Sequence, residues 1–319
     1  MISKILLLIG FLVAVLAQGD GSQSETHVTE VFNVKTGTEK GGCDNYNVNK
    51  WYSVSIRLLE DISHALKEAQ EAFEKGVTDS QIQKHLWTFF RIDATDASSK
   101  PFVDEMKENL TSVQGELKET ADGPDKPWIF CDGKYAEQKK WSDKALEPET
   151  GVPNADGKTI KQVFPELFPF WIDDIKQYRY AEENDYCFKA NRKNMAGTDD
   201  NFQPNTITFC PMNWKEVKYK TIDDIPAVTE EGISIKQFTV EGLTFFHEVF
   251  HYALESINTP DVAYNLNQIT GGEPLEDGTF ITPDQAIANP ESWTMFALAW
   301  KLGLRNPKFT FESSVSKSL

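Results

Sequence analysis

Residues 246–252 read FHEVFHY, and within them His247 and His251 stand four positions apart, with Glu248 directly after the first histidine. In an α-helix this spacing places both imidazoles on one face, one turn apart, where they can share a metal ion. Glu248 is too close in sequence to be a natural third ligand, but it can take a proton from water at that metal. We therefore expect a metal-binding helix over residues 240–257. The alternative is two surface histidines on an ordinary amphipathic helix, but an apolar stripe predicts burial: Leu243, Phe246, Phe250 and Leu254.

The residues that follow this helix offer a third ligand, because a catalytic zinc site uses three protein ligands and leaves one position open. Glu255 lies too far along the helix axis to reach the metal, so we reject it. Pro260 disfavours helix before it and Asn258 suits a left-handed turn, so the chain should double back near residue 258. Asp261 would then rise beneath the histidines as the third ligand, unless it is a turn residue bonded to its own backbone. Tyr264 can donate a hydrogen bond to an oxyanion, although plain packing is an equally good interpretation.

The segment 247–265, HEVFHYALESINTPDVAYN, resembles the aspzincin metallopeptidases, the deuterolysin-like and peptidyl-Lys endopeptidase group. The family signature is HExxH followed by Gly-Thr-x-Asp-x-x-Tyr-Gly, and Thr259, Asp261 and Tyr264 stand at the matching positions. The resemblance implies a zincin-like metallopeptidase fold and one zinc ion (Zn²⁺) held by the two histidines and Asp261. It also implies that the glutamate of HExxH is the general base and that Tyr264 assists the transition state.

The resemblance covers roughly residues 200–300 and has departures. Asn258 and Asn265 stand where the family has glycines, and asparagine tolerates positive φ better than other non-glycine residues. Two flanking segments are also similar to the family, TITFCPMNW at 206–214 and NPESWTMFALAW at 289–300. The exchange of the glycines affects the expected activity more than the expected zinc site.

The N-terminal segment predicts export. Residues 1–17 combine one lysine with an apolar run that ends in small residues, which is typical of a secretory signal peptide. Residues 18–42 are rich in Gly, Ser, Thr and charge and predict a flexible arm, followed by one metallopeptidase-like domain over 43–305 and a C-terminal tail over 306–319. The net charge of -17 argues against nucleic acid and anionic membranes as partners. We expect a secreted, extracellular monomer.

Four cysteines in an exported chain predict two disulfides, and three pairings are possible. The short loop between Cys187 and Cys210 favours their pairing, which leaves Cys43 with Cys131. None of the four has CxxC spacing, so a cysteine metal site is not expected. The sequon at Asn109 could carry a glycan, but it lies in a stretch that is expected to be helical.

The predicted fold class is α+β and mainly α-helical, with a helical N-terminal lobe, a small sheet and the HExxH helix. Apolar periodicity predicts helices over 51–75 and 79–90 and from residue 101, and a proline-initiated helix over 289–303. The alternating stretch 206–210 predicts a strand, either a core strand or the edge that binds a substrate.

These patterns favour a secreted zinc endopeptidase that acts on protein or peptide substrates. Two alternatives stay open: a secreted zinc-binding protein of the same fold without turnover, and an exported structural or adhesive protein without metal. Gly271 and Gly272 could let a bound chain approach the backbone closely, but a plain loop explains them as well.

Overall fold

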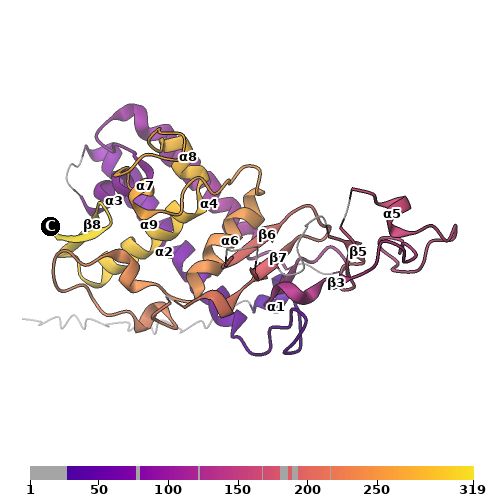
Figure 1. The fold of residues 1–319 in the computed structure, drawn as a ribbon. Helices are drawn as coiled ribbons and strands as arrows, with labels where there is room; N and C mark the ends of the chain where they lie inside the picture. The colour runs from indigo at the N-terminus through magenta and orange to yellow at the C-terminus, as the bar shows by residue number, and fades with distance from the viewer. Residues whose placement is uncertain are drawn as a thin grey trace, which may run out of the picture.

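The computed structural model describes residues 27–76, 80–120, 123–166, 168–179, 186–188, 193–215 and 217–319. The predicted signal peptide at 1–17 lies outside these residues. The described chain is an α+β protein, as the sequence predicted for the fold class; its helical body carries a four-stranded and a three-stranded sheet on one side and a two-stranded hairpin at the opposite end (Figure 1). Among the described residues, no helix combines the length and apolarity needed to cross a membrane.

The helical body is built around α2 (Val48–Lys75), which packs against α4 (Lys100–Glu116), α6 (Gly242–Leu254) and α9 (Pro290–Arg305). Gly76 has a φ of 62° and ends α2 as predicted, because the left-handed conformation causes no clash for glycine. The other helices are shorter: α1 (Val28–Val31), α3 (Gln81–Phe90), α5 (Ile160–Val163), α7 (Leu266–Ile269) and α8 (Pro283–Ala288).

The predicted helix boundaries are close to the observed ones. Helix α3 begins at Gln81 because the Ser80 hydroxyl accepts a hydrogen bond from a first-turn amide and forms a capping box with Gln83. Helix α4 begins at Lys100, one residue before the predicted start, and Ser99 in front of it makes no side-chain capping bond. Helix α6 ends at Leu254 rather than near residue 257, for a reason given with the site below.

The main sheet has the strand order β1 (Asn33–Val34), β2 (Trp128–Phe130), β7 (Thr206–Phe209), β6 (Ala196–Asp199). The first three strands are parallel and β6 is antiparallel to β7. The predicted strand over 206–210 is therefore present, but it is an interior strand with partners on both sides. Because its backbone groups already pair with β2 and β6, β7 cannot be the edge that binds a substrate. Within the described sheet, the edge beside α6 is β6.

A β-rich projection extends from the body between β2 and β6 (Figure 1). It contains the antiparallel strands β3 (Glu137–Gln138), β4 (Phe170–Ile172) and β5 (Gln177–Tyr178), together with α5. Its buried side chains form two small clusters separate from the main core. The projection therefore has little of the long-range packing that fixes the helical body.

The folded region extends beyond the predicted boundaries at both ends. In the segment that we expected to be a flexible arm, α1 and β1 join the fold, and Val31 and Phe32 are buried in the main core. In the predicted tail, β8 (Phe309–Glu312) and β9 (Val315–Ser318) form a hairpin that buries Phe311. Both predicted boundaries were wrong because they relied on the polar composition of the two segments. A few buried apolar residues in each segment are enough to dock it on the core.

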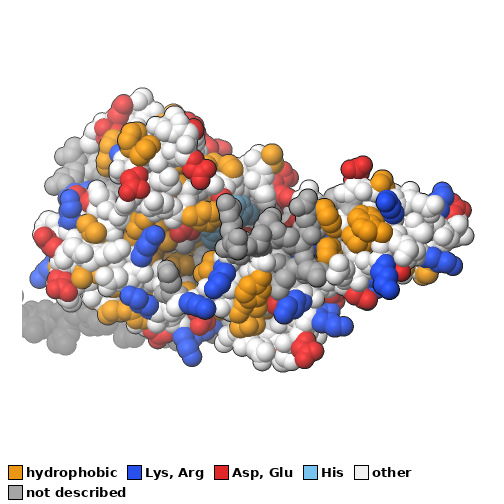
Figure 2. Space-filling model, in the orientation of Figure 1, with side chains coloured by type: hydrophobic (Ala, Val, Ile, Leu, Met, Phe, Trp, Pro, Cys, Tyr) orange, Lys and Arg blue, Asp and Glu red, His pale blue; other side chains and the backbone are white. Residues whose placement is uncertain are grey.

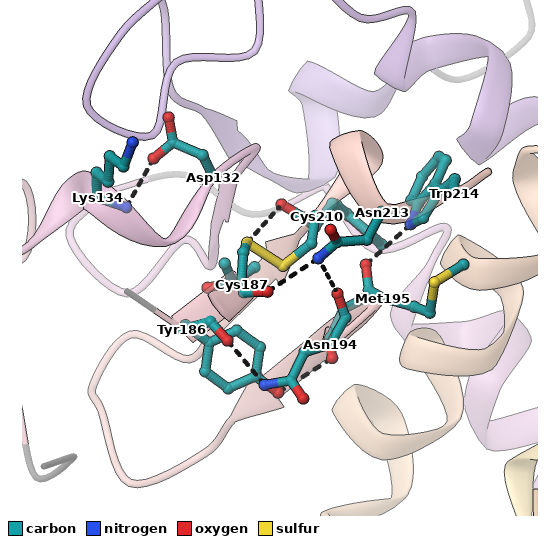
Figure 3. The surroundings of a disulfide bond; sticks show 12 residues. Asp132, Lys134, Tyr186, Cys187, Asn194, Met195, Cys210, Asn213 and Trp214 are labelled. Carbon is teal, nitrogen blue, oxygen red and sulfur yellow. Dashed lines mark hydrogen bonds between the residues drawn. A yellow bond between two sulfur atoms is a disulfide. The ribbon is translucent and has the colours of Figure 1, made fainter. Parts of the chain in front are cut away.

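Both predicted disulfides are present, Cys43–Cys131 and Cys187–Cys210. Cys43–Cys131 ties the loop after β1 to the end of β2. The second disulfide lies near β6 and β7, and Asn213 braces it by donating hydrogen bonds to the carbonyl oxygens of Cys187 (2.9 Å) and Asn194 (2.8 Å) (Figure 3). This brace holds the chain that leads directly into β6.

Candidate metal centre

Helix α6 carries both histidines on a face turned away from its packing against α2. Gly242 allows the two helices to approach closely, because a Cβ there would lie 2.7 Å from Val54. His247 and His251 are each only 6% exposed, and their Nε2 atoms lie 3.2 Å apart. In the space-filling view, histidine atoms are visible in a recess between the helical body and the projection (Figure 2).

The chain reverses at Glu255, three residues earlier than the sequence suggested. Glu255 has a φ of 65°, and its carbonyl oxygen accepts hydrogen bonds from the amides of Asn258 (3.0 Å) and Thr259 (3.1 Å). The predicted left-handed residue, Asn258, does not have positive φ, and Asn265 has a φ of -75° and caps α7. The absence of the family's two glycines therefore does not strain this turn.

The turn delivers Asp261 to the histidine pair, as predicted. Asp261 Oδ1 lies 3.1 Å from His247 Nε2 and 3.3 Å from His251 Nε2. Together with the 3.2 Å between the two nitrogens, these three donor atoms form a nearly equilateral triangle. Ligands bound to zinc at about 2.0–2.1 Å in tetrahedral directions stand about 3.3 Å apart. The group could therefore hold a metal ion, and its spacing fits a small tetrahedral one.

Hydrogen bonds at the Nδ1 atom of each imidazole orient the Nε2 atoms toward the point where a metal ion would lie. The Thr259 hydroxyl lies 3.1 Å from His251 Nδ1 and donates its only proton to the carbonyl oxygen of Glu255 at 2.9 Å. The hydroxyl oxygen must therefore accept a hydrogen bond from the Nδ1–H group of His251, which leaves Nε2 with its lone pair. The Glu291 carboxylate, 3.2 Å from His247 Nδ1, acts as an acceptor in the same way. Two lone pairs and a carboxylate that converge at about 3 Å repel one another unless a cation lies between them.

Protonation of His247 would relieve the same repulsion. Burial works against protonation of His247, but the hydrogen bonds that its ring N–H groups donate to Asp261 and Glu291 outweigh burial and raise the pKa of His247 to about 10. Burial likewise opposes ionisation of Asp261, whereas its contacts with His247 and His251 hold its pKa well below the usual range. Metal binding must therefore displace a proton.

Glu248 of α6 lies beside the same site, where its side chain contacts Thr198 of β6. Its carboxylate is 4% exposed and accepts a hydrogen bond from the Thr198 hydroxyl at 2.9 Å. Burial raises the pKa of Glu248, and the nearby histidines act in the opposite direction. It does not belong to the group of three possible ligands, which agrees with its predicted role beside the metal rather than on it.

Tyr264 lies at the mouth of the site. Its ring stacks on the ring of His247 with centroids 5.8 Å apart, and its hydroxyl is hydrogen-bonded to Asp261. Burial and this carboxylate raise the pKa of Tyr264, so the hydroxyl stays protonated and available as a donor. The residue remains 60% exposed, so it borders the recess instead of filling the core.

Three residues of the site were not assigned a role there from the sequence. Glu291 was recognised only as an acidic residue at a helix start, Thr259 only as part of the family signature, and Thr198 not at all. Asn289 completes the arrangement because its buried amide bonds both backbone groups of Ala263, 3.3 Å from the amide nitrogen and 3.2 Å from the carbonyl oxygen. This pair fixes the loop between Asp261 and Tyr264 to the start of α9. Only the NPE run hinted at such a role, and the sequence gives no signal for Thr198.

A scan against models of known protein families and a search of curated proteins gave no match to this chain.

Proposed function

We propose that this protein is a zinc-dependent endopeptidase of the aspzincin type. The observation that carries the proposal is the convergence of His247, His251 and Asp261 on one point, with a buried carboxylate, Glu248, beside them. A structural role would not require two buried histidines and a buried glutamate beside a fourth ionisable group, Asp261, because each buried group costs free energy to desolvate.

The proposed mechanism assigns a task to each residue. A bound zinc ion would polarise the scissile carbonyl and lower the pKa of a water ligand to about 7. Glu248 accepts the proton of the attacking water and passes it to the leaving amine, and Thr198 holds that carboxylate in position. The Tyr264 hydroxyl donates a hydrogen bond to the carbonyl oxygen as negative charge develops there.

We further propose that the substrate is an extended peptide that pairs with β6. This strand is antiparallel, lies at the edge of the described sheet and contacts α6. Its Thr198 touches Glu248, so a peptide on the free side of β6 would lie close to the proposed general base. The sequence offered residues 206–210 as the strand that pairs with a substrate; we assign this pairing to β6 instead.

Secretion is part of the same proposal. Two disulfides among the described residues fit an oxidising compartment, and the apolar N-terminal run fits export.

The test compares the parent protein with Glu248→Gln. We expect the parent to contain one zinc ion per chain and to cleave casein and a Lys-containing peptide. Glu248→Gln should retain the zinc and lose cleavage by a factor on the order of a thousand or more, because the proton acceptor is missing. Glu276→Gln, which changes an exposed glutamate, serves as the matched control and should cleave normally.

Metal analysis of the zinc content and mass spectrometry of the cleaved peptides distinguish an enzyme from the two alternatives that the sequence left open. Equal cleavage by parent and Glu248→Gln would contradict the mechanism. Zinc without any cleavage would indicate a non-catalytic zinc-binding protein, and absence of both would indicate a protein without a metal role.

A further inference from the structure

A second hollow lies outside the metal centre, between α3, the loop after α7 and the turn of the β8–β9 hairpin. Its volume is about 490 Å³, which is the size of a small-molecule site. The residues that give it chemical character come from all three segments: Lys84, Trp87, Arg91, Gly271, Gly272 and Glu312. None of them belongs to the proposed peptidase machinery.

Arg91 is the central group of this hollow. It ends α3 with a φ of 58°, a position where glycine is usually found, so the arginine is kept at some conformational cost. Its guanidinium lies 4.2 Å from the centre of the Trp87 ring. One nitrogen, Nη1, makes both backbone hydrogen bonds, to Trp87 O at 3.1 Å and Thr270 O at 2.9 Å. The other N–H groups of the guanidinium are therefore left for a ligand.

The lining of this hollow carries a positive charge, that of Arg91, which no carboxylate of the described lining pairs with. Glu312 is the one acidic residue among those that line the hollow, and it pairs with Lys84 at 3.7 Å and with Lys317 at 3.4 Å. Among the described residues, no carboxylate lies within ion-pairing distance of Arg91. A cation left unpaired in a chain with a net charge of -17 is notable, because acidic side chains are abundant.

The loop at Gly271 is fitted to the guanidinium. Gly271 has a φ of 68°, and a Cβ at this position would lie 3.1 Å from Arg91 Cζ. Any larger residue would push the arginine out of place. Of the two glycines, Gly271 therefore does allow a close approach to the backbone, but by the Arg91 side chain, whereas Gly272 lies near Asn267.

We propose that this hollow binds a small organic anion whose carboxylate or phosphate group pairs with Arg91 and whose flat apolar part lies against Trp87. Half of the Trp87 surface is exposed, which provides the apolar contact. The fork of guanidinium N–H groups matches both anionic groups, and partial burial strengthens the pairing. The proposal does not depend on peptidase activity.

Four probes test it by calorimetry with the intact protein: benzoate, phenyl phosphate, benzamide and acetate. We expect benzoate or phenyl phosphate to bind at least tenfold more tightly than benzamide, which lacks the charge, and than acetate, which lacks the ring. The ratio of benzoate to phenyl phosphate affinity tells whether the site prefers a carboxylate or a phosphate. If none of the four binds at millimolar concentration, or if benzamide equals benzoate, the proposal is overturned.

Variants localise the binding. Arg91→Met should weaken binding of the better anion at least tenfold, whereas Arg57→Met, which removes a surface arginine paired with Asp223, should not change it. Because Arg91 also caps α3, Lys84→Met is a second variant that leaves the cap intact and should weaken binding severalfold. Unchanged affinity in both Arg91→Met and Lys84→Met would contradict the assignment.

Discussion

His85 and His247 are both buried, but their surroundings shift their pKa values in opposite directions. His85 lies on α3 among aromatic rings, accepts a hydrogen bond from the Phe311 amide at 3.3 Å, and burial lowers its pKa to about 3. At His247 the carboxylates of Asp261 and Glu291 outweigh burial and raise the pKa to about 10. Burial alone keeps a histidine neutral and structural. Carboxylates gathered around a buried imidazole cost free energy, and their presence distinguishes the candidate metal centre from the core.

The largest expected effect is the loss of zinc affinity on substitution of His247. His247→Ala removes one of three proposed ligands and should lower zinc affinity on the order of a thousandfold or more. Metal analysis after dialysis should find no zinc in His247→Ala and one equivalent in His85→Gln. Loss of zinc in His85→Gln, with retention in His247→Ala, would reverse the assignment of the two histidines.

A smaller effect is expected when only the carboxylate behind the ligand is altered. Glu291→Gln keeps the size of the side chain but weakens the acceptor at His247 Nδ1, so zinc affinity should fall about 10- to 100-fold. Competition with a zinc chelator measures the change, and Glu276→Gln is the control. Affinities equal within twofold would show that Glu291 acts only as a residue of the helix start.

The smallest effect concerns stability at His85. The pKa of His85 is about 3 in the folded chain against an ordinary value of 6.5, so the unfolded chain binds more protons between these pH values. The free energy of unfolding should therefore fall as the pH falls from about 6.5 toward 3, by at most about 1.4 kcal/mol per pH unit from this residue. His85→Gln can still accept from Phe311 and should show a shallower decline. Denaturant titrations of chelator-treated parent and His85→Gln at pH 6.5, 5.5 and 4.5 measure the free energy of unfolding. An equal decline with falling pH in both proteins would contradict the prediction.

Local signals in the sequence predicted a large part of the fold. Helix α2 was predictable because its apolar period runs without interruption to Gly76, and α9 because Pro290 follows a residue suited to capping. The HExxH spacing predicted the geometry of the histidine pair, since one helical turn fixes it. Asp261 was predictable from the proline before it and from the family signature, although the chain reverses at a different residue, Glu255.

Contacts between distant segments were not predictable in the same way. The polar stretch before Cys43 gave no sign that Phe32 would be buried, and the alternation in β7 did not show whether the strand lies at an edge or inside the sheet. The position of a strand depends on which segments pair with it on either side. The residues of β2 that pair with β7 lie 78 positions earlier in the chain, whereas β6 almost directly precedes β7. A pattern within one segment cannot encode that choice.

The sequence by itself determined the helical spacing of the two proposed histidine ligands, the disulfide-forming cysteines and the α+β class, because each follows from periodicity or residue type along a short stretch of chain. Only the tertiary structure decided that Glu291 stands behind His247, that Thr198 holds Glu248 and that β6 borders the site. These contacts join segments separated by 44 and 50 residues, and long-range packing, not local propensity, brings such segments together.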